Sequence, residues 1–326
     1  MVFWKTYPIY NVLQTLWNCK PFLSMRFEKD TVTSPTGTPC EIHTVNNTLP
    51  TVLKDIQQYL RSHFGKPPHK PVLNIPLHYL LGTKDCILTV RDDTIGIVGC
   101  IRYHYMGEFI TSNNEPIYCV DCFCIHPDWR GKGIGDYLLT ELHFYVNRYE
   151  IPYSLFLKEG SQLSIVHPPM YSGNYVYRKV RVPMYNKYIF NITVKDAYHM
   201  IDIWKELHPH LFIIRNKEST NQKWVLYKKG IYRILACIQD AFQLIDTKRI
   251  GWITAWIESA SMTDCIRKEA ATTIADYSGF EFIWMNRVWE NCDTYNNEWK
   301  EDGAFYWYSY QWATGISIGS SYCILS

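Results

Sequence analysis

A glycine-rich turn at residues 130–135 carries the strongest chemical signal in the chain. It reads R-G-K-G-I-G and stands between an apolar strand predicted at 117–125 and a helix predicted at 134–148. Glycines allow positive φ angles and let the backbone approach a ligand closely. The unpaired amides of a helix's first turn, together with the helix dipole, attract anions. With Arg130 and Lys132 beside it, the turn predicts a phosphate site; the alternative is an ordinary strand–turn–helix connection.

Two stretches of the chain are predicted to contain the same order of elements. In the first, periodicity and turn residues predict helices at 51–64 and 134–148 and strands at 86–90, 94–103, 117–125, 154–157 and 175–182. In the second, they predict helices at 194–207 and 263–277 and strands at 223–227, 230–238, 251–257, 282–285 and 305–312. The repetition indicates an α+β fold with tandem domains at 1–184 and 185–326, each a mixed sheet flanked by helices. The second domain has E-S-A-S-M-T at 258–263 in place of the glycine turn, so one anion site is expected.

The glycine turn resembles the pyrophosphate-binding loop of the GNAT acyltransferase superfamily, which holds coenzyme A thioesters. A duplicated GNAT fold with one such loop resembles the glycylpeptide N-myristoyltransferase family, and three further segments support the likeness. Residues 3–9 are similar to the family's F-W-x-T-Q-P-V, with Tyr7 in place of Gln. Residues 120–126 stand where the family has I-N-F-L-C-V-H, and residues 302–312 resemble D-G-N-L-Q-Y-Y-L-Y-N-W.

This resemblance implies transfer of a myristoyl group from coenzyme A to the N-terminal glycine amine of a peptide or protein. An α-amino group titrates near about 7.7–8.0, so the amine is mostly protonated at neutral pH and needs a proton acceptor. By resemblance, the acceptor is the C-terminal carboxylate of Ser326, on an apolar tail expected to be buried rather than frayed. The backbone amides of Cys122 and Phe123 are then implied to stabilise the oxyanion.

The same resemblance implies two sets of binding residues. Those for the acyl-CoA are Val2, Phe3, Trp4, Cys122, Phe123, Cys124, Ile125, Arg130, Gly131, Lys132, Gly133, Ile134 and Gly135. Those for the acceptor are Tyr175, Tyr177, Asp302 and Gly303.

Departures from the family pattern gather on the acceptor side. An acidic stretch of the family corresponds to the basic segment 65–70, a histidine is lost at 175–178, and Arg287 replaces an acid. Like charges in a binding cleft disfavour a partner, so an altered acceptor or a weak enzyme is one hypothesis. A GNAT acetyltransferase that uses acetyl-CoA on another amine is a second, with Glu141 or His126 as weak candidates for the base. A catalytically inactive acyl-CoA-binding protein is a third.

Composition restricts the protein class. The chain has 326 residues, 47% of them hydrophobic, and a formal net charge of +2, so a packed core is expected and nucleic acid is not an expected partner. No apolar run is long enough for a membrane span, and the first residues lack a signal peptide. The 11 cysteines, with Cys122 and Cys124 on one face of a strand, are expected to be reduced core thiols rather than metal ligands. We therefore expect a cytoplasmic monomer without a metal.

Overall fold

The computed structural model describes ten parts of the chain. They are residues 33–64, 72–109, 115–149, 153–163, 169, 171–180, 186–208, 213–290, 298–310 and 322–324. The predicted domain boundary between residues 184 and 185 lies outside these ranges, as do the predicted site residues Val2, Phe3, Trp4 and Ser326. None of the described helices is long and apolar enough to cross a membrane.

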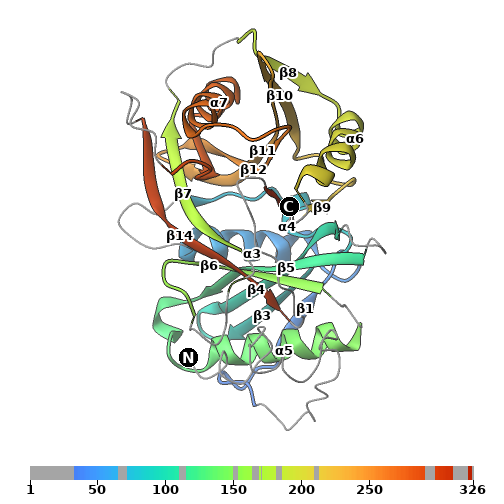
Figure 1. Cartoon of the computed structure of the whole chain (residues 1–326). Coiled ribbons are helices and arrows are strands. Elements are labelled where there is room, and N and C mark those ends of the chain that lie inside the picture. The colour runs from blue at the N-terminus through green and yellow to red at the C-terminus, as the bar shows by residue number, and fades with distance from the viewer. Residues whose placement is uncertain are drawn as a thin grey trace.

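The element order repeats along the chain (Figure 1). The first half contains β1 (Glu41–His43), α3 (Pro50–His63), β2 (Val72–Leu73), α4 (Leu77–Leu80), β3 (Cys86–Asp92), β4 (Gly96–Phe109), β5 (Glu115–Ile125), a 3-10 turn (Pro127–Trp129), α5 (Ile134–Arg148), β6 (Tyr153–Glu159) and β7 (Tyr171–Lys179). The second half contains β8 (Ile189–Ile192), α6 (Val194–Trp204), a 3-10 turn (Lys205–Leu207), β9 (Ile213–Arg215), β10 (Lys223–Lys229), β11 (Tyr232–Ile245), β12 (Lys248–Glu258), α7 (Asp264–Tyr277), β13 (Phe282–Asn286), β14 (Trp299–Tyr310) and β15 (Tyr322–Ile324). The predicted α+β repeat is confirmed.

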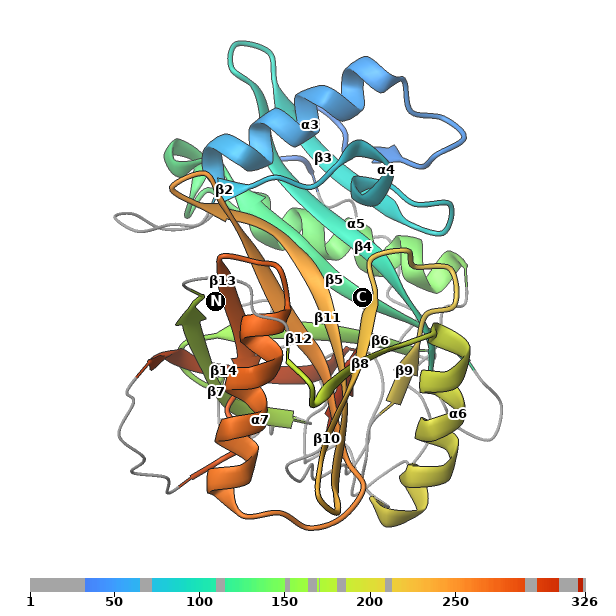
Figure 2. The same ribbon diagram turned by 90° about the horizontal axis from the view of Figure 1, so that it is seen from above.

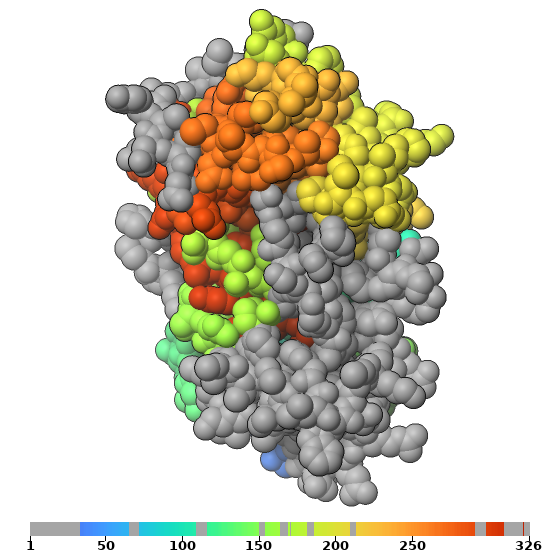
Figure 3. All heavy atoms as spheres, viewed as in Figure 1, coloured from blue at the N-terminus to red at the C-terminus, as the bar shows by residue number. Residues whose placement is uncertain are grey.

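The two halves share one continuous sheet rather than two separate ones. The strand order is β1-β3-β4-β5-β6-β14-β7-β13-β12-β11-β10-β8. Each half therefore gives a late strand to the other, because β14 pairs with β6 and β7 pairs with β13. In the space-filling view, green atoms of β7 and red atoms of β14 meet between the two halves (Figure 3). This exchange joins the two hydrophobic cores through paired backbone.

Helices α3 and α5 cover opposite faces of the first-half sheet (Figure 2). Ile134 and Leu138 of α5 pack with Leu88 of β3, whereas Leu60 of α3 packs with Ile87, the next residue on the same strand. Successive side chains of a strand point to opposite faces, so adjacent apolar residues can serve two layers. This part of the sheet is consequently buried on both sides.

Short elements absent from the sequence prediction connect the two halves. β9 pairs with the end of β4 and with β15, and β15 also pairs with β12. Gly107 of β4 has φ +133°, and a Cβ there would lie 2.1 Å from the carbonyl oxygen of Arg215. Only glycine permits this approach, so the position tightens the contact between the halves.

Candidate active site

The glycine turn takes the geometry expected of an anion site. Gly131 and Gly133 have φ angles of +79° and +86°, and Gly133 is the N-cap of α5 without a side-chain cap. Among the described residues, no backbone carbonyl accepts from the amides of Ile134 or Gly135. Left-handed glycines and free first-turn amides together expose donors at the helix N-terminus. The turn can therefore receive a phosphate group.

Both basic side chains of the turn have defined contacts. Arg130 donates from Nε to the carbonyl oxygen of Ile125 at 3.2 Å, which ties the turn to the end of β5. Lys132 places Nζ 4.6 Å from the ring centroid of Trp129. The two charges lie on either side of Gly131, so they add to the field of the helix terminus.

A bulge interrupts β5 at Cys122. The register pairs Cys100 with Cys124 and Arg102 with Asp121, which leaves Cys122 and Phe123 together opposite one residue of β4. Cys122 has φ +49°, a left-handed conformation uncommon outside glycine, at the point of the bulge. Bulges of this kind re-aim the backbone next to binding sites.

The bulge does not hold a reactive cysteine. Burial, followed by the charge of Asp121, raises the pKa of the Cys122 thiol well above its usual range, so a nucleophilic thiolate is disfavoured. Cys122 and Cys124 pack on the same side of the sheet, against α3, as the alternation predicted. Every cysteine side chain that the structure describes is a free thiol.

The parallel pairing of β5 with β6 ends just before the bulge. It runs from Ile117 opposite Tyr153 to Val120 opposite Phe156 and then stops. Beyond that point the two strands diverge, and no other described strand pairs with this edge of β5. The divergence leaves strand-edge donors and acceptors open to a ligand that can add to the sheet.

A cavity of about 1580 Å³ opens at this divergence, with walls from both halves of the chain. Of the predicted site residues, those on its walls are Cys122, Phe123, Cys124, Ile125, Arg130, Tyr175, Tyr177, Asp302 and Gly303. The remaining described ones, Gly131, Lys132, Gly133, Ile134 and Gly135, lie outside the cavity and connect to it through Arg130. The structure thus brings all four predicted acceptor residues and five of the predicted donor residues to one cavity.

Tyr175 occupies the junction of the two halves. It pairs with Asn286 of β13 and with Gly303 of β14, and its ring stacks on that of Phe305 at 4.1 Å. Burial raises the pKa of Tyr175 well above its usual range, and the nearby carboxylate of Glu159 adds to the shift. Tyr175 is therefore a neutral hydroxyl at neutral pH.

Two polar pairs in the cavity were not predicted from sequence. Arg102 donates to both carboxylate oxygens of Asp121, from Nε at 2.7 Å and from a terminal nitrogen, and it also donates to the carbonyl of Tyr79 at 2.8 Å. His104 lies 3.1 Å from Asp85. Burial works to raise the pKa of Asp85, but the hydrogen bond and charge of His104, with the charge of Arg102, hold it below its usual value. The alternation of side chains along β4 puts Arg102 and His104 on one face of the sheet. Nothing in the sequence showed that this face borders a cavity.

Another unpredicted residue, Glu159, lines the same cavity at the end of β6. The residue is exposed, yet desolvation of its carboxyl by the surrounding protein raises the pKa, and the charge of Asp302 adds to the shift. Glu141 and His126, the weak candidates from sequence, do not line the cavity. His126 instead packs its ring 4.6 Å from that of His63 and accepts a hydrogen bond from the amide of Asp128.

The equivalent positions in the second half are closed. β12 pairs in parallel with β13 only up to Ile253, and Thr254 is then the extra residue of a bulge. Beyond it, β15 pairs with Ala255 and Trp256 and occupies the edge that stays open in the first half.

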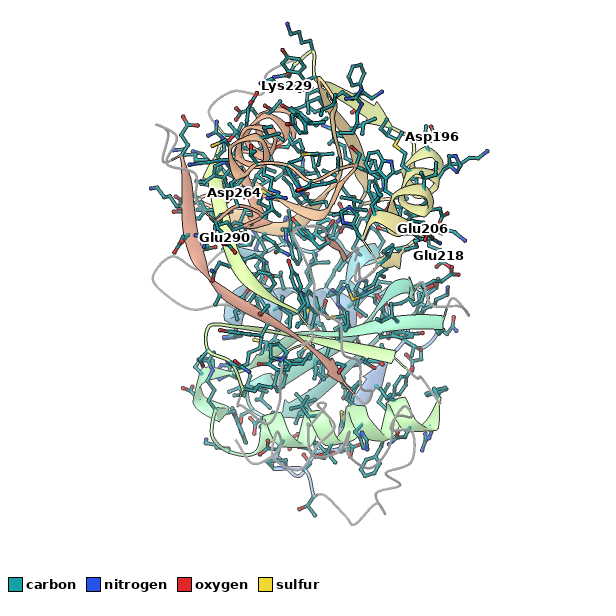
Figure 4. All side chains as sticks on the ribbon, viewed as in Figure 1. Asp196, Glu206, Glu218, Lys229, Asp264 and Glu290 are labelled. Atoms are coloured by element: carbon teal, nitrogen blue, oxygen red, sulfur yellow. The ribbon has the colours of Figure 1, made fainter. Side chains whose placement is uncertain are left out.

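Ahead of α7, the place of the anion site holds a carboxylate network instead. Arg267 binds both oxygens of buried Glu258, at 2.8 and 3.0 Å, and Asp264 at 3.0 Å. Asp264 also accepts from the amide of Glu290, and both labelled residues lie at the start of α7 (Figure 4). An anion would meet two carboxylates here, so the second half has no equivalent phosphate site.

The fold and the glycine turn are those of a GNAT domain, and residues 83–168 match the family model for the acetyltransferase (GNAT) domain. Over the whole chain the fold is the duplicated one of N-myristoyltransferase. A crystal structure of Saccharomyces cerevisiae N-myristoyltransferase with bound myristoyl-CoA superposes with a TM-score of 0.62, covering 98% of this chain and 94% of that one at 11% identity. A second structure of the yeast enzyme, with bound myristoyl-CoA and inhibitors, gives 0.63, with 98% and 93% coverage and 11% identity. A comparison with curated protein sequences finds no match.

Proposed function

We propose that this protein is an N-acyltransferase that moves a long-chain acyl group, myristoyl in the first instance, from coenzyme A to an N-terminal glycine amine. The observation that carries the proposal is the contrast between an open β5 edge beside a glycine turn in the first half and a closed edge beside an acidic network in the second. The yeast enzyme with the same duplicated fold is described with bound myristoyl-CoA.

The donor belongs to the first half, residues 1–184, in this proposal. Phosphates of coenzyme A lie on the turn from Arg130 to Gly135, and the thioester lies along the open edge of β5. The backbone amides of Cys122 and Phe123 donate to the oxyanion that forms when the amine attacks the carbonyl carbon. Preorganised amides at a bulge need little rearrangement during this step, which supports the assignment.

The acceptor peptide enters against the two exchanged strands, β7 from the first half and β14 from the second half, residues 185–326. Tyr175, Tyr177, Asp302 and Gly303 line its side of the cavity, where β7 and β14 exchange between the halves. A peptide amine that lies there meets the thioester across the divergence of β5 and β6.

The α-carboxylate of Ser326 is the proposed acceptor for the proton released at the attacking nitrogen. Support comes from the family resemblance and from β15, which pairs with β12 and β9 and whose Tyr322 is buried, with its ring 6.4 Å from that of Tyr171. A carboxylate within hydrogen-bond reach of the attacking nitrogen can act as the base.

The first test compares donors and then acceptors. We expect tighter binding of myristoyl-CoA than of acetyl-CoA in a calorimetric titration, and transfer of myristate to a peptide that begins with glycine. Appending one residue after Ser326 moves the carboxylate and is expected to lower kcat by about 100-fold or more without changing the Kd of myristoyl-CoA. Full activity in the extended protein would contradict the role of Ser326.

The match to the acetyltransferase domain model supports a second candidate, transfer of acetyl from acetyl-CoA to another amine. It predicts equal or tighter binding of acetyl-CoA and turnover with amines other than N-terminal glycine. Binding of myristoyl-CoA with no turnover on any amine would indicate an inactive acyl-CoA-binding protein.

A further inference from the structure

Glu159 lies across the β5–β6 divergence from the bulge. The register of the parallel pair advances one residue on each strand, from Ile117 with Tyr153 to Val120 with Phe156. Continued for three more residues, it would set Glu159 opposite Phe123. The strands separate there instead, so the carboxylate and the bulge border the same gap. Both residues line the cavity in which the proposed reaction takes place.

Glu159 is held in place by pairing on its other edge. It is opposite Phe305 in the antiparallel pair of β6 with β14, and the following residue, Gly160, donates its amide to the carbonyl of Ala304 at 2.8 Å. The neighbouring Lys158 lines the same cavity, and its ammonium group donates to the carbonyl of Ser161 rather than to Glu159. A rigid strand end thus presents this carboxylate to the cavity.

No cation neutralises Glu159 within the described part of the chain. The charged group that acts on it is the carboxylate of Asp302 on β14, and the hydroxyl of Tyr175 on β7 also faces it. On the same wall, Asp121 is paired with Arg102 and Asp85 with His104, whereas Asp302, like Glu159, has no cationic partner among the described residues. Of these two carboxylates, Glu159 is the one on β6, across the divergence from the bulge, so it is the one that we assign to accept a proton or bind a cation from a substrate.

We propose that Glu159 is a second catalytic residue, which binds the ammonium group of the acceptor and removes its first proton. This assignment deepens the proposed function and rests on it. An ammonium substrate must lose one proton to become a nucleophile, and a second after attack.

Glu159 takes the first proton from the ammonium, and the nitrogen lone pair then forms a C–N bond to the thioester carbon. The carbonyl electrons move to oxygen, at the amides of Cys122 and Phe123, and return as the C–S bond breaks. The Ser326 carboxylate takes the second proton and passes it to the departing thiolate. Amide and free coenzyme A result, and Glu159 releases its proton to water.

The pKa of Glu159 suits this role. Desolvation and the charge of Asp302 both raise it above the ordinary value for a glutamate, which makes the carboxylate a stronger base. Desolvation also raises the pKa of Asp302. A bound ammonium would reverse part of both shifts, so the pair favours a cationic acceptor over a neutral one.

The experiment compares Glu159→Gln with a matched control, Glu301→Gln. Gln has the shape of Glu and keeps the fold, which thermal unfolding checks. Glu301 lies on β14 next to Asp302, is exposed, pairs with Arg287 at 2.7 Å and does not line the cavity. We expect Glu159→Gln to lower kcat/KM for a glycine peptide by about 100-fold and to remove the acidic limb of its pH profile. The Kd of myristoyl-CoA stays unchanged, and Glu301→Gln matches the wild type in every readout.

Full activity in Glu159→Gln, with an active wild type, would overturn this assignment and leave the proposed function intact. If the wild type transfers acyl to no amine, the proposed function fails, and Glu159 is then judged by binding. With a non-cleavable thioether analogue of myristoyl-CoA bound, the wild type should prefer a peptide with a free α-ammonium over its N-acetylated form by about tenfold. Loss of that preference in Glu159→Gln supports the ammonium site; no preference in the wild type, or an unchanged one in the variant, contradicts it.

Discussion

The two halves share one scaffold, but among the described strands the edge beside the bulge is open in the first half and paired in the second. In each, a parallel pair of strands ends at a bulge, at Cys122 in β5 and at Thr254 in β12. The first half then leaves its strand edge open and opens its helix with glycines, whereas the second fills the edge with β15 and binds Arg267 to Glu258. In the second half, β15 takes the strand edge that a ligand would pair with, and the carboxylate of Glu258 takes the position near the helix start that an anionic ligand would occupy. The difference teaches that a repeat of a duplicated fold can lose a site when its own chain fills it.

The ion pair of the second half gives the largest expected effect. Arg267→Met leaves the buried carboxylate of Glu258 without its guanidinium, and we expect a loss of about 3 kcal/mol in the free energy of unfolding. Urea denaturation measures it. The matched control is Arg287→Met, which breaks an exposed pair with Glu301 and should cost less than about 1 kcal/mol. Equal losses in the two variants would show that the network does not stabilise the closed half.

The glycine turn gives the next largest effect. Gly133→Asp sets a carboxylate beside the bound phosphates and strains a φ of +86°, so we expect the affinity for myristoyl-CoA to fall by about 100-fold. The same change in the second half, Ser261→Asp, lies in the loop before α7 and should leave affinity unchanged. Calorimetric titration of both variants decides the point. A weakened Ser261→Asp would mean that the second half also takes part in donor binding.

Removal of a buried threonine hydroxyl should have opposite effects in the two halves. Thr254 is 1% exposed, and its hydroxyl has no hydrogen-bond partner among the described residues. Thr254→Val should therefore raise the free energy of unfolding by about 1 kcal/mol. In the first half, Thr89 bonds His43 at 2.8 Å, so Thr89→Val should lower it by about 1 kcal/mol. A loss in both variants would indicate that Thr254 has a partner in the folded protein.

The smallest effect is a pH dependence. Because the folded-state pKa of Glu159 is raised, its ionised form weakens the folded state above the unfolded value of 4.5. Glu159→Gln should then raise Tm slightly near pH 7, and the gap should close below about pH 4, where both states are protonated. Asp85→Asn should do the reverse, since a lowered pKa stabilises the folded state above about pH 4 and the benefit is lost on acidification. Differential scanning calorimetry across pH 3–8 measures the change in Tm of both variants. A change of the same sign in the two variants would contradict the opposite pKa shifts assigned to Glu159 and Asp85.

Local signals in the sequence predicted the elements that depend on neighbours along the chain. The helix predicted at 134–148 is α5 with the same bounds, because a glycine N-cap and a continuous apolar stripe define both its ends and its buried face. β14 begins at Trp299, earlier than predicted, since Lys300, Glu301 and Asp302 are charged and exposed and this part of the strand pairs with β7. Strand pairs between distant segments leave little trace in local pattern.

The candidate site divides in the same way. The glycine turn was evident from spacing, and Cys122, Phe123 and Asp302 from resemblance to a family. Glu159 was missed because its chemistry depends on three distant events: β6 leaving β5, the closure of a cavity, and the arrival of Asp302 on an exchanged strand. The alternating pattern of residues along β6 predicts none of these three features of the fold.

By itself, the sequence determined an α+β repeat, one anion-binding turn and its helix, since φ preferences, capping and apolar spacing act over a few residues. Only the tertiary structure decided that β7 and β14 exchange between the halves, and that β15 pairs with the strand edge of β12 while the edge of β5 stays open. Only the tertiary structure, too, places Glu159 beside the open edge of β5 with a carboxylate, Asp302, as its charged neighbour. The physical reason is that strand edges take whichever backbone lies nearest in space, and a carboxyl's pKa follows the burial and charges around it rather than its place in the chain.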